Sequence, residues 1–442
     1  MYEVKVRAVH DTSGLFSQGD FTNKPCPAIL VGPDALNSRH YRIEYYLSEN
    51  PPKMKDRTTS KPPYSVPGMT DIKALPWNGY NAISTFSGCG GSSLGYKMAG
   101  FKVLWASEFV PAAQEVYRLN HDGTFLDTRD IRQVQPEEIL AQIGMRPGDL
   151  DLLDGSPPCA SFSTAGKREK GWGEVKKYSD TRQRTDDLFF EYARILRGLQ
   201  PKVFVAENGS GLVKGKAKGY FKMILAALKD CGYNVKAKLL DAQWLGVPQM
   251  RQRLIFIGVR EDLGLQPVFP APLPYRYSVR EAIPWIVEVE MGKGFGEMGI
   301  EDAGNTPYMT VGTSPSSGNG LASNVYAVEP ESSIEGYAIG NEWDRLGPKE
   351  KGKYLNFVKP AIDEPCPTVT QAGGNTSAAS VVHPLQKRKF SIAELRRICG
   401  FPDDFKLVGT YAQQWERLGR AVPPVMMSHI ATTVRDEILA KL

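Results

Sequence analysis

Short apolar runs alternate with amphipathic segments along the first half of the chain. The runs that predict buried strands are 81–86, 102–108, 150–153 and 202–207. Apolar residues with helical spacing follow at 92–99 and 187–198. An alternation of short strands with helices predicts an open α/β sheet. Two further runs, 232–242 and 253–259, predict a pair of neighbouring strands.

Residues able to do chemistry stand where these strands end. The first strand runs into the glycine-rich turn 87–91, the second ends in Glu108, the third leads to Cys159 and the fourth ends in Glu207. Because ligands bind beyond the carboxyl ends of the strands in open α/β sheets, we expect these groups to share one site. Each signal alone is weak. A lone cysteine is usually a small buried apolar residue, and a glycine turn serves a nucleotide, a flavin or simple chain reversal.

Five sequence blocks strengthen this expectation because they occur together and in order. They are FSGCGGSSLGYKMAG (86–100), SPPCASFS (156–163), AEN (206–208), QMRQR (249–253) and GRAVPP (419–424). In this order and at these spacings the chain resembles the DNA cytosine-C5 methyltransferases. The resemblance implies a Rossmann-like class I methyltransferase domain with a mixed, mostly parallel sheet. It also implies S-adenosylmethionine as cofactor and double-stranded DNA as partner.

The resemblance divides the chain into parts. It implies a catalytic and cofactor-binding domain at 78–263, a smaller target recognition domain at 264–385, and a C-terminal segment, 386–442, that completes the catalytic domain. Residues 1–77 precede this division. Alternating β-formers there predict a β-rich N-terminal appendage, whose role the sequence leaves open.

The catalytic roles also follow from the resemblance. Cys159 adds to C6 of a cytosine flipped out of the duplex, Glu207 gives N3 a proton or hydrogen bond, Arg253 holds the carbonyl oxygen of the base, and Arg251 steadies the site. Alternation along one strand places Gln249, Arg251 and Arg253 on the same face.

Two larger sets of residues complete the expected site. The expected cofactor-binding residues are Phe86, Ser87, Gly88, Gly90, Gly91, Leu94, Glu108, Phe109, Asp130, Ile131, Pro158, Leu188, Arg420, Ala421 and Val422. The expected DNA-binding residues are Ser163, Lys167, Arg168, Arg182, Arg184, Asn208 and Gln249.

Positive charge is concentrated just after Cys159, although the net charge is only +5. Residues 164–253 hold 19 Lys and Arg against 9 Asp and Glu, whereas 265–364 hold 8 against 14. A basic segment beside the expected nucleophile fits the phosphates of a nucleic acid, and a solvated charged face is the alternative. We interpret 165–187 as a lid that closes on DNA, with segmental disorder as the competing interpretation.

Three positions depart from the family pattern. Ala160 stands where the family commonly has glutamine, Gly209 where it more often has valine, and Arg420 where it usually has asparagine near the transferable methyl group. Arg420 either turns outward to a glutamate or phosphate, or pairs with the carboxylate of carboxy-S-adenosylmethionine in a carboxymethyltransferase. The other rival hypotheses are an RNA cytosine-C5 methyltransferase and a catalytically silent DNA-binding homologue.

Composition limits the class of protein. A hydrophobic content of 41% and a charged content of 23% are typical of globular proteins, and no apolar run approaches the roughly 20 residues of a membrane helix. Six scattered cysteines form no CxxC pair, which predicts reduced thiols and no metal site. We expect a cytoplasmic monomer of bacterial or phage type, associated with the nucleoid. A cognate restriction endonuclease is an open partner.

Overall fold

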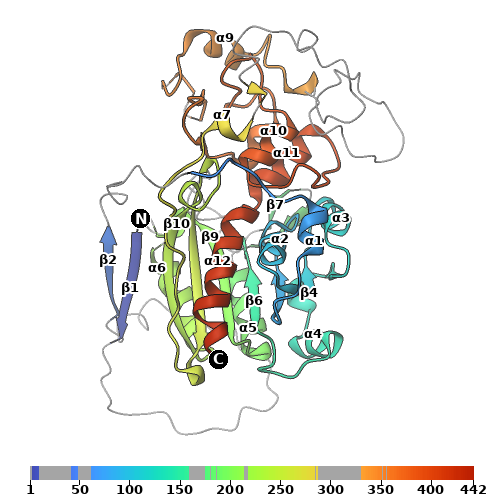
Figure 1. Ribbon diagram of the computed structural model, residues 1–442, viewed down its shortest axis with the longest axis vertical. Helices are drawn as coiled ribbons and strands as arrows, with labels where there is room; N and C mark the ends of the chain where they lie inside the picture. The colour runs from blue at the N-terminus through green and yellow to red at the C-terminus, as the bar shows by residue number, and fades with distance from the viewer. Residues whose placement is uncertain are drawn as a thin grey trace.

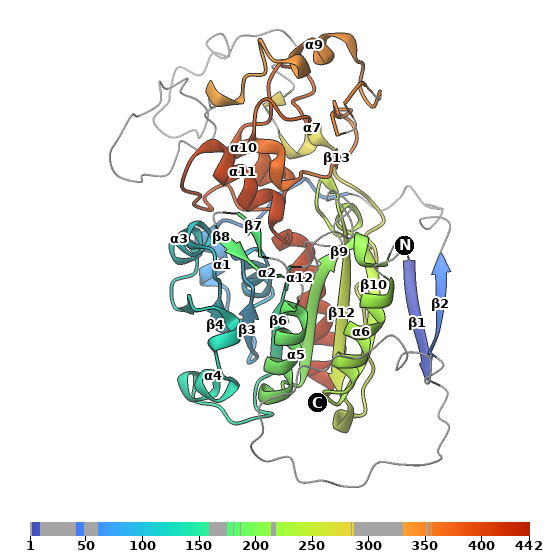
Figure 2. The same ribbon diagram turned by 180° about the vertical axis from the view of Figure 1, so that it is seen from behind.

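A computed structural model shows a twisted sheet flanked by helices, with a second helical unit at one end (Figures 1 and 2). The residues that the structure describes are 2–8, 41–47, 61–158, 175–179, 181–185, 187–213, 218–283, 285–286, 330–350, 352–354 and 356–442. The sheet has nine strands in the order β2-β1-β10-β12-β9-β6-β3-β4-β5.

The central seven strands form the mixed sheet that the sequence predicts. Strand β12 runs antiparallel to both β9 and β10, whereas β9, β6, β3, β4 and β5 run parallel to one another. This arrangement confirms the α/β, mostly parallel prediction. The strands are β3 (Asn81–Thr85), β4 (Lys102–Ser107), β5 (Phe125–Asp127), β6 (Leu152–Gly155), β9 (Val203–Gly209), β10 (Tyr233–Asp241) and β12 (Gln252–Arg260).

Helices cover both faces of this sheet. Helices α2 (Gly91–Met98) and α12 (Pro424–Glu437) lie on one face, and α4 (Pro136–Ile143), α5 (Leu188–Leu199) and α6 (Lys218–Lys229) lie on the other (Figures 1 and 2). The short α3 (Pro111–Asn120) follows β4. The chain therefore returns from its C-terminal region to pack α12 against α2, beside the glycine turn.

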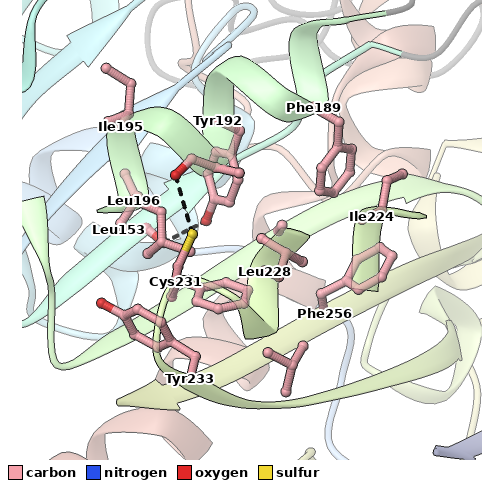
Figure 3. Close-up of a cluster of buried hydrophobic side chains, with 14 of the residues drawn as sticks. Leu153, Phe189, Tyr192, Ile195, Leu196, Ile224, Leu228, Cys231, Tyr233 and Phe256 are labelled. Carbon is pink, nitrogen blue, oxygen red and sulfur yellow. Dashed lines mark hydrogen bonds between the residues drawn. The ribbon is translucent and has the colours of Figure 1, made fainter. Parts of the chain in front are cut away.

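Aromatic side chains fill the layer between α5, α6 and the sheet (Figure 3). Phe189 meets Phe256 edge to face with ring centroids 5.5 Å apart, and Tyr192 is fully buried beside them. Burying each such ring contributes roughly 1.5–3 kcal/mol. Cys231 lies in the same layer, where its Sγ donates to the Ala193 carbonyl at 3.4 Å, and burial raises the pKa of its thiol.

A second hydrophobic core lies above the carboxyl ends of the strands. It joins Cys89 and Leu94 of the glycine turn and α2 to Trp415 and Leu418 of α11 (Tyr411–Arg420). The remaining elements of this region and of the hairpin before α5 are α1 (Met69–Ala74), α7 (Val279–Ala282), α9 (Ala338–Arg345), α10 (Ile392–Ile398), β7 (Lys176–Tyr178), β8 (Thr181–Gln183), β11 (Gln249–Met250) and β13 (Cys366–Pro367).

The N-terminal region contributes strands, as the sequence predicts. Strand β1 (Tyr2–Ala8) pairs antiparallel with β10, and β2 (Tyr41–Leu47) pairs antiparallel with β1, so both extend the sheet at one edge. Residues from Lys61 onward contact the second unit instead, since the Tyr64 hydroxyl donates to the Arg397 carbonyl at 2.6 Å. The segment just before the expected boundary at 77 is therefore packed structure.

Candidate active site

The turn between β3 and α2 has a backbone that only glycine adopts easily. Gly88 and Gly90 have φ of 57° and 92°, and a Cβ built at Gly90 would lie 2.0 Å from His121 Nε2. A Cβ at Gly91 would lie 2.3 Å from the Val422 carbonyl oxygen. A Cβ at Gly88 would meet nothing within 4 Å. The turn is thus tightly packed on the side of α3 and the C-terminal segment and open at Gly88, where a ligand could approach the backbone.

Glu108 ties the end of β4 to this turn. Its Oε2 accepts from the Gly88 amide and its Oε1 from the Val110 amide, both at 2.7 Å. Burial raises the pKa of Glu108, while the backbone amides and Arg417 oppose that shift. A carboxylate fixed at this strand end is placed to accept hydroxyl groups of a ribose.

The other expected cofactor residues differ in how far their side chains are buried. Leu94, Ile131, Leu188 and Val422 are buried, whereas Phe109 keeps 36% of its surface exposed. Ser87, also buried, donates its hydroxyl to the Ser84 carbonyl at 2.8 Å, and Pro158 and Phe86 are half-buried. Asp130 pairs with Arg132 at 2.9 Å, so part of its carboxylate is already occupied.

The carboxyl ends of β6 and β9 meet beside the turn. Asn208 donates its side-chain amide to the Pro157 carbonyl at 3.0 Å, and the Ser156 amide donates to the Thr85 carbonyl at 3.3 Å. Pro157 stands two residues before Cys159, and Asn208 follows Glu207 directly. Cys159 itself lies outside the described residues, but the chain on its N-terminal side is held against the residue next to Glu207.

Glu207 and Arg253 form a buried ion pair. Arg253 Nε lies 2.7 Å from Glu207 Oε1, with 18% and 10% of the two side chains exposed. Burial lowers the pKa of Arg253, and the negative charge of Glu207 opposes that shift. Within the described part of the chain, the other oxygen of Glu207 has no hydrogen-bond donor. Among the described residues, Arg253 contacts one edge of the Glu207 carboxylate.

Gln249 and Arg251 are buried and bonded within the protein. Gln249 belongs to β11, which pairs with β13, and it is fully buried with its Oε1 accepting from the Val369 amide at 3.3 Å. Arg251, 1% exposed, donates to the carbonyls of Val369, Gly419 and Ala421 at 2.8–2.9 Å.

The strand assignment pauses at Arg251, between β11 and β12. Gln249 and Arg251 both contact Val369, and the charges of Arg253 and Glu207 act on the pKa of Arg251, which burial lowers to about 9. Arg251 anchors the segment that carries Ala421.

Arg420 turns toward a glutamate, as one of the two sequence hypotheses predicts. Its Nε lies 2.7 Å from Glu416 Oε1, one turn earlier on α11, and its guanidinium lies 4.2 Å from the centre of the Tyr178 ring. The positive charge that the carboxymethyl hypothesis needs for the carboxylate of carboxy-S-adenosylmethionine is therefore already paired within the protein.

Only part of the basic segment can be located. Ser163, Lys167 and Arg168 lie outside the described residues. Arg182 is exposed on β8, whereas Arg184 pairs with Asp187. The Arg184 backbone carbonyl also accepts from Arg132 at 2.7 Å. Among the expected DNA-binding residues of this segment that the structure describes, Arg182 is the one with an exposed side chain and no ion pair to another described residue, so it is accessible to DNA.

Sequence reasoning missed Asp154. It lies in β6, one residue before the strand ends at Gly155, and is 1% exposed. Its carboxyl accepts from the Ser84 hydroxyl at 2.7 Å and the Tyr96 hydroxyl at 3.2 Å. It pairs with Val205 and so faces the same side of the sheet as Glu207. Burial is the main cause that raises the pKa of Asp154 to about 7, and the charge of Glu207 adds to it.

Asp154→Asn should therefore remove a pH dependence of stability. The folded protein holds the Asp154 proton up to about pH 7, whereas the unfolded chain releases it near pH 4, so the native state loses stability as pH rises between those values. Relative to the parent, the free energy of unfolding of the variant should rise by about 2 kcal/mol from pH 5 to pH 7. Urea unfolding across that range measures the difference. Parallel stability curves would contradict a neutral buried carboxyl.

Comparison with known proteins identifies the family. The model of the C-5 cytosine-specific DNA methylases matches residues 80–436. The chain belongs to this family. Type II methyltransferase M.NgoPII of Neisseria gonorrhoeae is 29% identical over 84% of this chain and 99% of its own length. Type II methyltransferase M1.HphI of Haemophilus parahaemolyticus is 31% identical over 80% of this chain and 86% of its own.

A solved structure of a candidate DNA modification methyltransferase, encoded within an Escherichia coli prophage, has the same fold. It superposes with a TM-score of 0.59 at 20% identity and covers 82% of this chain and 99% of its own. The protein is therefore a DNA cytosine-C5 methyltransferase that uses S-adenosylmethionine. The carboxymethyltransferase and RNA hypotheses are not favoured, because the family and its relatives are DNA methyltransferases and Arg420 is already paired.

The described residues include neither a membrane-spanning helix nor a metal-binding group. Among the described residues, no helix is long and apolar enough to cross a membrane. In the same part of the chain, no three His, Cys, Asp or Glu side chains are grouped so as to hold a metal ion.

Proposed function

We propose that Cys159, Glu207 and Arg253 are the catalytic residues of this methyltransferase. The observation that carries the proposal is the junction of strand ends, in which Asn208 bonds Pro157 while Glu207 pairs with Arg253. This junction holds the chain before the cysteine next to the carboxylate of Glu207. A cytosine ring flipped into this place would meet a nucleophile and a hydrogen-bonding carboxyl.

The chemistry then follows from what a cytosine needs. C5 is a poor nucleophile, so the Cys159 thiolate first bonds to C6 and pushes electron density toward C5 and N3. Glu207 gives N3 a proton or hydrogen bond, and Arg253 holds both Glu207 and the carbonyl oxygen of the base. After methylation at C5, loss of the C5 proton and breakage of the sulfur–C6 bond restore the aromatic ring.

The residues around the glycine turn fit S-adenosylmethionine, which supplies the methyl group when bound. The backbone at Gly88 is open to an approaching ligand, and Glu108 is held at the strand end with lone pairs that can accept ribose hydroxyls. Phe109 offers an exposed ring for an adenine to stack on. Val422 and Ala421 close the side of the turn next to the C-terminal segment.

The DNA partner would be held mainly by the basic segment, with the acidic 264–385 region reading bases through a few contacts. We expect a monomer that acts in the cytoplasm on nucleoid DNA. A restriction endonuclease of the same specificity is the partner expected for a relative of type II methyltransferases.

Sequencing that distinguishes 5-methylcytosine from cytosine tests the proposal. DNA from cells that express the protein should carry 5-methylcytosine at one short recurring motif, and DNA from cells that express Cys159→Ala should carry none. Methylation that persists in the variant, or an absence of modified cytosine with the intact protein, would contradict the proposal.

A further inference from the structure

A short hairpin reaches from the basic segment to the C-terminal end of α11. Strands β7 and β8 pair from Lys176↔Gln183 to Tyr178↔Thr181. Ser179, which follows β7 directly, has a φ of 54°, which non-glycine residues adopt at some cost. The hairpin follows Cys159 in the sequence and precedes α5. It contacts α11 through Tyr178 and Ser179, which we call its tip.

Three charged residues of α11 receive the tip. The Arg420 guanidinium lies 4.2 Å from the centre of the Tyr178 ring, and Arg417 donates to the Ser179 hydroxyl. Glu416 pairs with both arginines, at 2.7 Å to Arg420 and 3.0 Å to Arg417. The Glu416 carboxylate thus orients two guanidinium groups: that of Arg420, beside Tyr178, and that of Arg417, beside Ser179.

Arg417 of α11 also contacts the glycine turn. The Arg417 carbonyl accepts from Cys89 Sγ at 3.7 Å, and the positive charge of Arg417 acts against the burial that raises the pKa of Glu108. Tyr178 is buried enough that its pKa is raised, and Glu108 is near enough for its charge to add to that shift. Arg417 therefore joins the hairpin to the glycine turn, and the Gly88 amide of that turn donates to Glu108.

We propose that Arg420 is a positioning residue. Its contact with the Tyr178 ring, here called the clasp, holds the hairpin beside the cofactor site, so that the hairpin forms one side of that site. This inference rests on the cofactor site proposed above. It gives a reason for arginine at a position where the family usually has asparagine. The Glu416 carboxylate, which Arg420 shares with Arg417, offsets part of the repulsion that an unpaired Arg420 would exert on the sulfonium of the cofactor. The Tyr178 ring and the Arg420 guanidinium attract each other, and such contacts are strongest when both groups are shielded from bulk water.

Calorimetric titration with S-adenosylhomocysteine, without DNA, measures the clasp independently of turnover. Tyr178→Ala and Arg420→Asn should each weaken binding about fivefold to tenfold, because each removes one half of the cation–ring contact. Tyr178→Phe keeps the ring, and Arg420→Lys keeps the cation, so each should recover most of the affinity. Arg345→Asn is the matched control, since Arg345 pairs with Glu342 on the distant α9, and it should bind as the parent does.

Limited trypsin digestion separates the clasp from general destabilisation. Lys176, Lys177 and Arg182 lie on the hairpin, so cleavage there should be several times faster in Tyr178→Ala and Arg420→Asn while the melting temperature stays near that of the parent. Unchanged affinity in both variants, with normal binding by the parent, would overturn the clasp alone. Failure of the parent protein to bind would overturn the proposed cofactor site, and the clasp with it.

Discussion

Replacement of Cys159 by alanine should reduce DNA methylation to less than about a thousandth of the parent rate, the largest loss of any single change considered. The reason is chemical, because C5 of cytosine becomes nucleophilic only while sulfur is bonded to C6. A radiolabelled methyl-transfer assay on genomic DNA measures the rate. DNA binding, followed by electrophoretic mobility shift, should persist.

The matched control is Cys231→Ala. Cys231 is a buried thiol in the layer between α5, α6 and the sheet, far along the chain from the strand-end junction, and burial raises the pKa of its thiol. That variant should lose some stability and keep its methyl-transfer rate within about twofold, because its truncation leaves only a small cavity. Comparable activity of Cys159→Ala and the parent would show that the reaction does not proceed through this thiol.

Glu207→Gln should lower the single-turnover rate by about a hundredfold or more, since an amide cannot give N3 the proton that the carboxyl gives. The variant should also lose about 1–3 kcal/mol of stability, because the buried Arg253 guanidinium keeps a hydrogen-bond acceptor but loses its counter-charge. Rapid-quench methylation at saturating DNA and thermal melting measure the two effects separately.

Glu394→Gln distinguishes the chemical effect from the stability effect. Glu394 forms a buried pair with Arg388 at 2.8 Å in the region outside the strand-end junction. This control should lower the melting temperature and leave the single-turnover rate of the folded protein near that of the parent. An equal fall in rate in both variants would mean that Glu207 acts only by maintaining the fold.

The sequence predicts the sheet well because its signals are local. Short apolar runs that end in glycine or a carboxylate placed β3, β4, β6 and β9, and the glycines after β3 predicted a turn whose positive φ angles the structure contains. The sequence predicted that residues at the strand ends lie close together. It did not predict the specific contacts between Asn208 and Pro157 or between Arg253 and Glu207. Resemblance to the family supplied the roles.

Long-range pairing explains what the sequence did not predict. The contacts of Gln249 depend on residues far along the chain, because β11 pairs with β13, more than a hundred residues later, and the Gln249 side chain accepts from the Val369 amide. Asp154 and Gly155 lie within β6, although an Asp-Gly pair usually marks a turn. Only the hydroxyl groups of Ser84 and Tyr96, brought from β3 and α2, make a carboxyl tolerable at the end of a buried strand. Likewise, the side chains of Glu416 and Tyr178, which decide where Arg420 points, meet it only in the folded chain.

The covalent bond between enzyme and base tests the central claim most directly. A duplex that carries 5-fluorocytosine at the methylated motif should trap the protein in the presence of S-adenosylmethionine, because fluorine at C5 cannot leave as a proton does. We expect an adduct that survives denaturation, with the DNA attached to the peptide that contains Cys159. A trapped complex at another residue, or no complex with DNA that the protein otherwise methylates, would contradict catalysis by Cys159.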